Sequence, residues 1–117
     1  LPGGKVYVYQ GSDEPYLYVG GAIGEETGTS ILRNDKGDEM TVLKQHRESM
    51  KIMDTENAIV NEFVAITGEV EGQYIEKVDD DGNSFHALYW FDDEYGYQIT
   101  GECPREDILR IAKGLCS

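Results

Sequence analysis

The chain has 117 residues, room for one domain, and its composition of 39% hydrophobic and 28% charged residues is that of a soluble globular protein rather than a disordered or fibrous one. Its 23 acidic residues outweigh 10 lysines and arginines, and the net charge of −13 argues against nucleic acid or an anionic membrane as a partner. Cationic partners and divalent ions stay compatible with this charge.

The beginning of the chain bears on its origin. No apolar run approaches the roughly 18 residues of a membrane-spanning helix, so we expect no direct membrane insertion by this segment. The sequence starts at Leu1 without a Met or a signal-like region. We interpret residues 1–117 as a single domain trimmed from a longer chain.

The first 30 residues predict a hairpin followed by a loop. Residues 5–10 (KVYVYQ) and 16–23 (YLYVGGAI) are typical of strands, and the GSDEP stretch between them is typical of a turn. Gly20 and Gly21 indicate a β-bulge or a close approach of another backbone. Residues 24–30 are polar and rich in glycine, so we expect a loop there.

A second hairpin is predicted next. Residues 30–33 and 39–45 have strand-like composition, and residues 34–38 (NDKGD) between them carry turn chemistry. Residues 46–57 are polar and mixed, so we interpret them as a connector.

The second half predicts a meander of four strands, because short turns separate its apolar runs. The predicted strands are residues 58–67, 73–78, 85–91 and 95–100. Alternation in the third of them places two sets of side chains on opposite faces of the sheet. One set is Phe85, Ala87, Tyr89 and Phe91, and the other is His86, Leu88 and Trp90.

A C-terminal helix is predicted after Pro104, which suits a first helical turn. Apolar residues recur there at spacings of three and four and form one stripe, which we expect to lie on the sheet. The stripe consists of Ile108, Ile111, Ala112 and Leu115. Gly114 is the predicted helix stop.

The cysteines, Cys103 and Cys116, bracket this helix. A continuous helix would separate their Cα atoms by about 20 Å, whereas a disulfide requires about 7 Å or less. We therefore predict no bridge between them, and no nearby His or second Cys suggests a metal site or a reactive thiol.

No motif predicts catalysis or a cofactor. Asp79, Asp81 and Asn83 imitate the start of a calcium loop, but the Gly and Glu positions of that loop do not match, so we interpret residues 79–83 as a hairpin turn. The two histidines are not at metal-ligand spacing, and no nucleophile elbow is present. We expect a protein that is not an enzyme, with no catalytic, cofactor-binding or metal-binding residues.

The densest aromatic cluster is the one candidate binding surface that the sequence offers. It consists of Tyr89, Trp90, Tyr95 and Tyr97. Packing in the core is the ordinary role of such residues. If the helix leaves one face of the sheet uncovered, however, these rings would line a groove for an apolar ligand or a peptide.

Three stretches of the second half carry a family resemblance: MDTENAIV (53–60), AITGEVEGQYIEK (65–77) and ALYWFDDEYGYQITGECPREDILRIAKGL (87–115). Together they resemble the C-terminal part of a family of domains of unknown function common in Firmicutes, in which a D-T-E-N-A stretch is followed by I-x-G-x-x-G-x-Y, L-x-W and Y-x-Y-x-I-x-G segments and a helix. The resemblance spans Met50 to Leu115, and Gly114 stands where the family usually has Ser.

The resemblance implies a location and a fold. Members are typically exported parts of lipoproteins or membrane-anchored proteins, some similar to anti-sigma factors, with a half-barrel like that of lipoprotein carriers. The family has no catalytic residues to carry over. Its recurring residues are interpreted as turn and packing positions: Gly68, Gly72, Tyr74, Trp90, Tyr97 and Gly101.

These observations lead to one overall expectation. The fold class is α+β, a curved antiparallel sheet of six to eight strands with one C-terminal helix packed on it. The function is that of a non-catalytic, extracytoplasmic module, at the cell surface or secreted, that binds or senses a protein, a cell-wall fragment or a small apolar ligand. The alternative is a carrier that holds a lipid-like ligand in a cavity between sheet and helix.

Overall fold

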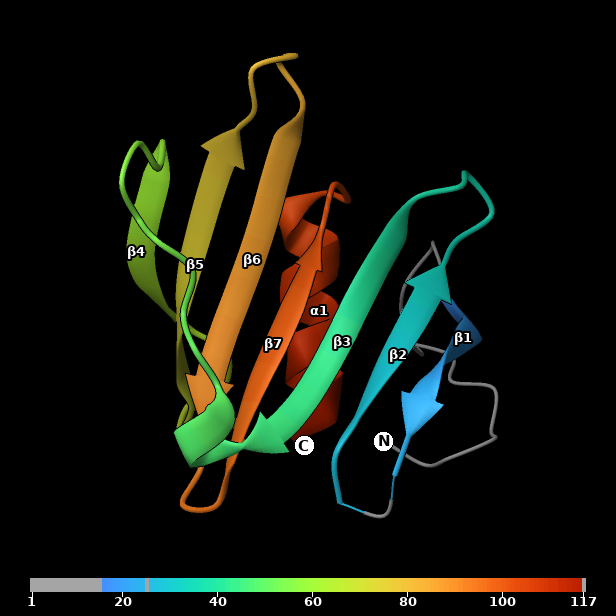
Figure 1. The fold of residues 1–117 in the computed structure, drawn as a ribbon, viewed down its shortest axis with the longest axis vertical. Helices are drawn as coiled ribbons and strands as arrows, with labels where there is room; N and C mark the ends of the chain where they lie inside the picture. Colours follow the sequence, from blue (N-terminus) through green and yellow to red (C-terminus); the bar gives the residue numbers. More distant parts are fainter. Residues whose placement is uncertain (1–15, 25, 117) are drawn as a thin grey trace.

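The computed structural model describes residues 16–24 and 26–116. They form one antiparallel sheet of seven strands and one C-terminal helix, which confirms the predicted α+β class (Figure 1). The strands are β1 (Leu17–Ile23), β2 (Gly28–Arg33), β3 (Glu39–His46), β4 (Val60–Ala65), β5 (Glu71–Val78), β6 (Ser84–Phe91) and β7 (Tyr95–Gly101). A short 3-10 helix, η1 (Arg47–Ser49), follows β3, and α1 spans Arg105–Cys116. Within the described part of the chain, no helix has the length and apolar character needed to cross a membrane.

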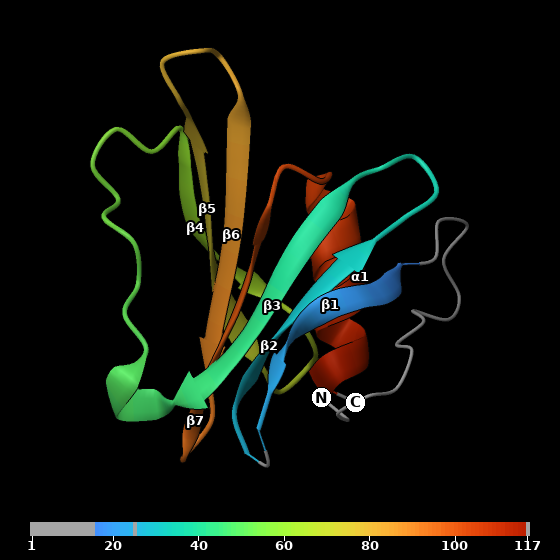
Figure 2. The ribbon, with the colours of Figure 1, turned by 45° about the vertical axis from the view of Figure 1, so that its right-hand side comes forward.

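The sheet consists of two meanders joined side by side. The strand order is β1-β2-β3-β7-β6-β5-β4, so β3 of the first meander pairs with β7, the last strand of the second. The predicted four-strand meander is thereby confirmed as β4 to β7. Figure 2 shows that the sheet is twisted and that α1 lies against one face, which we call the helix side. The other we call the connector side.

The connector between β3 and β4 covers part of the second face. Met50 and Met53 pack there with Ile75, Ala87 and Tyr89 in a small second core. A Cβ atom at Gly96 would lie 2.7 Å from the Cβ of Met50, so glycine at this position allows the connector to pack closely on β7. The predicted connector is confirmed, with η1 as its first turn.

The main core lies on the helix side. The helix contributes Ile108, Ile111 and Ala112, all at most 1% exposed, and the sheet contributes Leu88 and Ile99, both fully buried. The predicted stripe on α1 is therefore confirmed, and so is the alternation of β6, since Leu88 and Trp90 belong to this core and Ala87 and Tyr89 to the other.

A buried polar contact fixes the helix to the start of the described chain. The Tyr16 hydroxyl donates a hydrogen bond of 2.8 Å to Oδ2 of Asp107, and Arg110 forms an ion pair with the same carboxylate. Burial, followed by the hydrogen bond to Asp107, raises the pKa of Tyr16 well above its ordinary value. The tyrosine therefore stays a hydrogen-bond donor at any physiological pH.

Two hairpin turns share one local structure. The side-chain oxygen of Asn34 accepts hydrogen bonds from the backbone N–H groups of Lys36 and Asp38, and that of Asp79 accepts from Asp81 and Asn83. In each turn the fourth residue is a glycine with positive φ, 87° and 84° respectively. The second turn is the segment that imitates a calcium loop, and Asp79 caps it as in an ordinary turn.

The predicted bulge in β1 is confirmed. The register of β1 against β2 shifts between Tyr18 and Gly20. A Cβ atom at Gly21, whose φ is 139°, would lie 2.0 Å from the carbonyl oxygen of Thr29, so the neighbouring backbone approaches closely at this residue.

Two boundary predictions are wrong. Residues 28–30 belong to β2 rather than to a loop, because pairing with β1 and β3 on both sides overrides their polar composition. Gly114 does not end α1, which continues to Cys116, because Leu115 and Cys116 still pack against the core. The strand predicted at residues 5–10 lies outside the described residues.

Candidate functional site

Three of the four predicted surface aromatics lie on the helix side, near the C-terminal end of α1. Trp90 is only 4% exposed and stacks on Tyr97, with ring centroids 5.2 Å apart and planes 10° apart. Tyr95 stacks on His46 at 5.5 Å. The Nζ of Lys44 lies 4.1 Å from the centroid of Tyr95, a cation–π contact. Each of these rings is thus already engaged in a contact within the protein.

Hydrogen bonding also occupies the polar end of Tyr97. Its hydroxyl donates a 2.6 Å hydrogen bond to Oδ2 of Asp92. Burial and then this bond raise the pKa of Tyr97. Burial would raise the pKa of Asp92, but the bonds from Tyr97 and from the backbone N–H groups of Tyr95 and Glu94 outweigh it and lower that pKa.

Tyr89, the fourth predicted residue, lies on the connector side. It is 2% exposed, and its hydroxyl accepts a 3.2 Å hydrogen bond from the backbone N–H of Met53. Burial raises its pKa, although the bond from Met53 acts in the opposite direction. The structure therefore brings Trp90, Tyr95 and Tyr97 together and separates Tyr89 from them by the thickness of the sheet.

A small cavity lies beside this aromatic cluster, where the end of α1 meets the sheet. It has a volume of about 150 Å³ and is lined by Val42, Lys44, Tyr97 and Leu115. Pockets that hold drug-sized ligands have volumes of roughly 300–1,000 Å³. The cavity would accept a small apolar group, but not a long acyl chain, without rearrangement.

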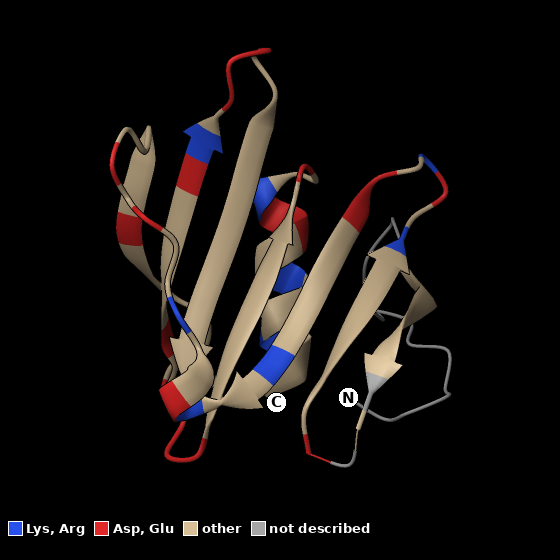
Figure 3. Ribbon diagram, in the orientation of Figure 1, with Lys and Arg blue, Asp and Glu red and all other residues tan. Residues whose placement is uncertain are grey.

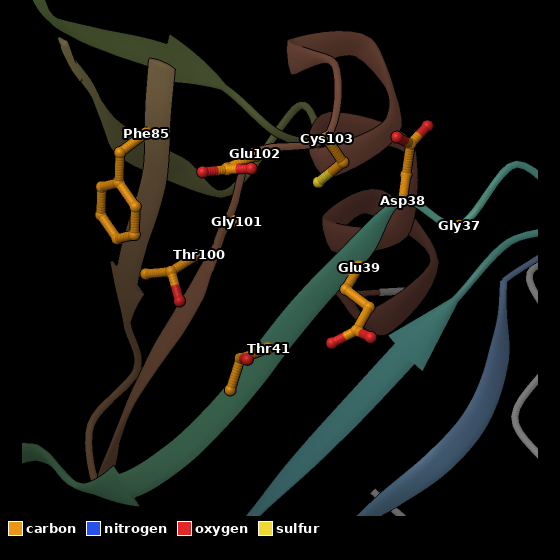
Figure 4. Close-up of a pocket in the computed structure, with 9 residues that line it drawn as sticks. All are labelled: Gly37, Asp38, Glu39, Thr41, Phe85, Thr100, Gly101, Glu102 and Cys103. Atoms are coloured by element: carbon orange, nitrogen blue, oxygen red, sulfur yellow. The ribbon is translucent and has the colours of Figure 1, made fainter. Parts of the chain in front are cut away.

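A larger depression lies at the opposite end of the sheet. The strand β7 ends at Gly101, opposite Met40 of β3 and His86 of β6, while both neighbouring strands extend further. The resulting notch between β3 and β6 has a volume of about 430 Å³. It is lined by Gly37, Asp38, Glu39, Thr41, Phe85, Thr100, Gly101, Glu102 and Cys103 (Figure 4). We call it the β3–β6 notch.

The β3–β6 notch combines three kinds of side chain. Phe85, which is 38% exposed, stands on the β6 side. Thr41 and Thr100, which are cross-strand partners on β3 and β7, supply two hydroxyl groups on the connector side of the sheet. Asp38, Glu39 and Glu102 supply carboxylates.

Acidic residues surround the notch because of the topology. In an antiparallel sheet, the β2–β3 turn, the β5–β6 turn and the end of β7 all lie at one end. Figure 3 shows acidic segments at this end, and others at the opposite end of the sheet, while the middles of β6 and β7 carry none. The acidic residues of these segments are Asp35, Asp38, Glu39, Asp79, Asp80, Asp81 and Glu102, and they outnumber the basic residues Arg33, Lys36 and Lys77.

Cys103 lies at the back of the notch and is fully buried. Burial raises the pKa of its thiol to about 12. At neutral pH the group is therefore a protonated thiol, a poor nucleophile and a poor metal ligand. Both cysteines are free, with the continuous helix α1 between them.

A polar cluster that sequence analysis did not identify lies on the helix side of β5 and β6. The Tyr74 hydroxyl contacts Nδ1 of His86 and lies 3.1 Å from Oε1 of Glu76. The guanidinium of Arg105 lies 4.3 Å from the Tyr74 ring centroid and pairs with Glu62 of β4. The alternation of side chains along β5 places Tyr74 and Glu76 on one face, which the sequence alone could have indicated. That His86 lies beside them follows from the pairing register of β5 with β6, which the sequence does not show.

This cluster holds structure together rather than forming an open site. Tyr74 is fully buried, and burial followed by the bond to Glu76 raises its pKa. The hydroxyl therefore remains protonated. The cluster joins β4, β5, β6 and the first turn of α1, with its hydrogen-bonding groups directed at one another.

In the described ranges 16–24 and 26–116, no three His, Cys, Asp or Glu side chains are arranged to hold a metal ion. Asp79 and Asp92 direct carboxylate oxygens at nearby backbone N–H groups.

The fold and the notch define an α+β domain whose open sheet is backed by a single helix. The family model described as Domain of unknown function (DUF4367) matches residues 23–115, and the chain belongs to this family. The match includes β2 and β3 as well as the region from Met50 onward. No curated protein matches the chain, and no solved structure does.

Proposed function

We propose that this domain is a non-catalytic binding module and that its ligand occupies the β3–β6 notch. The observation that carries the proposal is the composition of the notch, where an exposed aromatic ring, two hydroxyls and three carboxylates line one depression of about 430 Å³. This size falls in the range of ordinary ligand sites. A few polar groups around an apolar contact are what such a site needs for orientation and specificity.

The chemistry of the other titratable groups supports a role without catalysis. The thiol of Cys103 and the hydroxyls of Tyr16 and Tyr74 are held protonated by burial. His86 uses Nδ1 in its contact with Tyr74. These groups are engaged in internal contacts that a substrate would have to break.

The site of action is proposed to be outside the cytoplasm, at the cell surface or in the secreted fraction. This part of the proposal rests on the resemblance to exported Firmicute lipoproteins and anti-sigma-factor-like proteins, with the parent chain anchored by a lipid or a membrane segment. Fractionation of cells that express the parent protein tests it. Recovery in the cytosol alone would exclude an extracytoplasmic role.

The second candidate is a carrier of a lipid-like ligand. The cavity between α1 and the sheet, lined by Val42, Lys44, Tyr97 and Leu115, favours this candidate by its position. Its volume of about 150 Å³ requires the helix to move before a long chain can enter.

An NMR titration of the ¹⁵N-labelled domain distinguishes the two candidates. Three probes are added separately: a lysine-rich hexapeptide, a trimer of N-acetylglucosamine and dodecanoate. Binding at the notch shifts the amide signals of residues 38–41, 84–86 and 100–103. Shifts confined to residues 42–44, 97 and 115, caused by dodecanoate alone, would establish the carrier. If none of the three probes shifts the notch signals, the proposed site is wrong.

A further inference from the structure

We infer that the occupant of the β3–β6 notch is a short, extended, basic segment of a partner protein, which continues the line of β7 between β3 and β6. The inference rests on the proposed binding function and assigns the class of its ligand. Backbone geometry, charge and side-chain chemistry support it separately.

The backbone geometry leaves a space one strand wide. On β6, Ser84 and Phe85 extend beyond the last pair with β7, and on β3, Glu39 does so. These residues pair with β5 and β2 on their other sides. Neighbouring strands lie about 4.8 Å apart, so the ends of β3 and β6 stand roughly 10 Å apart with one strand position between them.

Peptide backbone fits this space better than other ligands. The carbonyls of Asn83 and Asp38 accept hydrogen bonds within their own hairpins, from Asp79 and Asn34. Because successive residues of a strand direct their backbone groups to opposite sides, Ser84 on β6 and Glu39 on β3 direct theirs toward the position that β7 no longer fills. An added strand satisfies such groups on both sides at once, as in other cases of strand addition. The overhang of two residues on β6 corresponds to about 7 Å, so two or three residues of the partner would lie in register.

Charge selects a basic segment. Of the three carboxylates that line the notch, Glu39 pairs with Arg33, and Asp38 accepts a 3.2 Å hydrogen bond from Nδ2 of Asn34. Glu102 takes part in none of the ion pairs formed between described residues. The net charge of −13 adds a long-range attraction for cations. Lys77, the cross-strand partner of Phe85, lies on the far side of β6 from the notch.

The exposed ring of Phe85 suits the side chains of such a segment. Lysine and arginine carry long aliphatic stems that pack on apolar surface while the charged end stays hydrated. A stem on Phe85 would place its charge within reach of the carboxylates across the notch, and Thr41 and Thr100 would supply further hydrogen bonds. A neutral sugar would use the ring and the hydroxyls but would gain little from the charge.

Fluorescence anisotropy with two matched peptides tests the inference. One labelled peptide alternates lysine with threonine over six residues, and the other carries glutamate in place of each lysine. We expect the basic peptide to bind and the acidic one not to bind. Glu102→Gln should weaken binding of the basic peptide about two- to fivefold, the effect of losing one partly exposed ion pair. Binding should also weaken as salt is raised from 50 to 500 mM.

Glu69→Gln is the matched control, because Glu69 is an exposed residue of the turn between β4 and β5 and the charge change is identical. It should leave the affinity unchanged. Equal effects of the two variants, or equal binding of the two peptides, would overturn the inference. If the N-acetylglucosamine trimer shifts the notch signals and the basic peptide does not, the binding function stands and the ligand class is wrong. If the basic peptide binds but shifts only signals away from the notch, both proposals fail.

Discussion

Gly101, the last residue of β7, lines the notch and lies against the backbone of β3. Replacing it by alanine tests how closely β7 and β3 pack at this residue. A Cβ atom there would lie 2.5 Å from the carbonyl oxygen of Glu39 and 3.2 Å from the Cα of Met40. Favourable contacts between carbon atoms are about 3.5–4.0 Å. Because the obstructing atoms belong to the backbone of β3, no change of rotamer relieves the contact, and the strands must separate.

The expected cost of Gly101→Ala is about 3 kcal/mol, the upper end of the ordinary range for overpacking. For a domain of this length, that loss lowers the melting temperature by about 10 °C. Urea unfolding followed by fluorescence measures it directly, since Trp90 is the only tryptophan and is buried against Tyr97. The signal therefore reports on the helix-side core.

Gly68→Ala provides the control. Gly68 lies in the turn between β4 and β5, and an added Cβ would meet nothing within 4 Å. We expect its stability to stay within about 0.5 kcal/mol of the wild type. A loss below about 0.5 kcal/mol for Gly101→Ala, or equal losses for the two variants, would refute the close contact between β7 and β3.

Three further outcomes follow from the structure. Burial raises the pKa of Cys103 from 9.0 to about 12, so the unfolded thiol ionises before the folded one. The stability that the buried thiol contributes is therefore complete below pH 9 and is lost at about 1.4 kcal/mol per pH unit above it. Urea unfolding at pH 8, 9 and 10 should show this slope in the wild type, and an unchanged slope in Cys103→Ala would contradict it. Gly96→Ala should cost about 1–3 kcal/mol by the same assay, because its Cβ would lie 2.7 Å from that of Met50 and the connector must lift from β7; a neutral effect would mean that the connector does not pack there. Ile108→Ala, which empties a fully buried position, should cost about 2–5 kcal/mol, whereas Lys113→Ala on the exposed side of α1 should change little, and comparable losses would contradict the docking of α1 on the sheet.

Local patterns in the sequence predict individual elements well. Strict alternation from Phe85 to Phe91 assigns each side chain of β6 to the correct face, and the spacing of Ile108, Ile111 and Leu115 identifies the packed stripe of α1. Both patterns depend on the period of one element. That period is fixed by backbone geometry and needs no knowledge of neighbours.

Boundaries and neighbours follow a different logic. Residues 28–30 look like a loop by composition but become a strand because β1 and β3 pair with them on both sides. The helix passes through Gly114 because Leu115 still gains from burial. These outcomes depend on tertiary contacts, which outweigh local propensity. A single sequence does not show which contacts form or how much they stabilise.

The candidate site belongs to this second kind of feature. The aromatic cluster was visible in the sequence, yet Trp90 and Tyr89 are almost completely buried, on opposite faces. The β3–β6 notch arises because β7 ends before its two neighbours, β3 and β6, do. Since β3 is distant from β6 and β7 in the chain, the sequence does not show that these strands are neighbours. A glycine at the end of β7 is the only local signal of that difference.

The most direct test of binding at the notch is amide hydrogen exchange with and without a saturating concentration of the lysine–threonine peptide. We predict that exchange slows at residues 39 and 84, and not along β4, an edge strand of the described sheet. Phe85→Ala should abolish the slowing, whereas Phe63→Ala, at a phenylalanine that is 71% exposed on β4, should preserve it. Slowing along β4 instead, or equal effects of the two substitutions, would contradict binding at the β3–β6 notch.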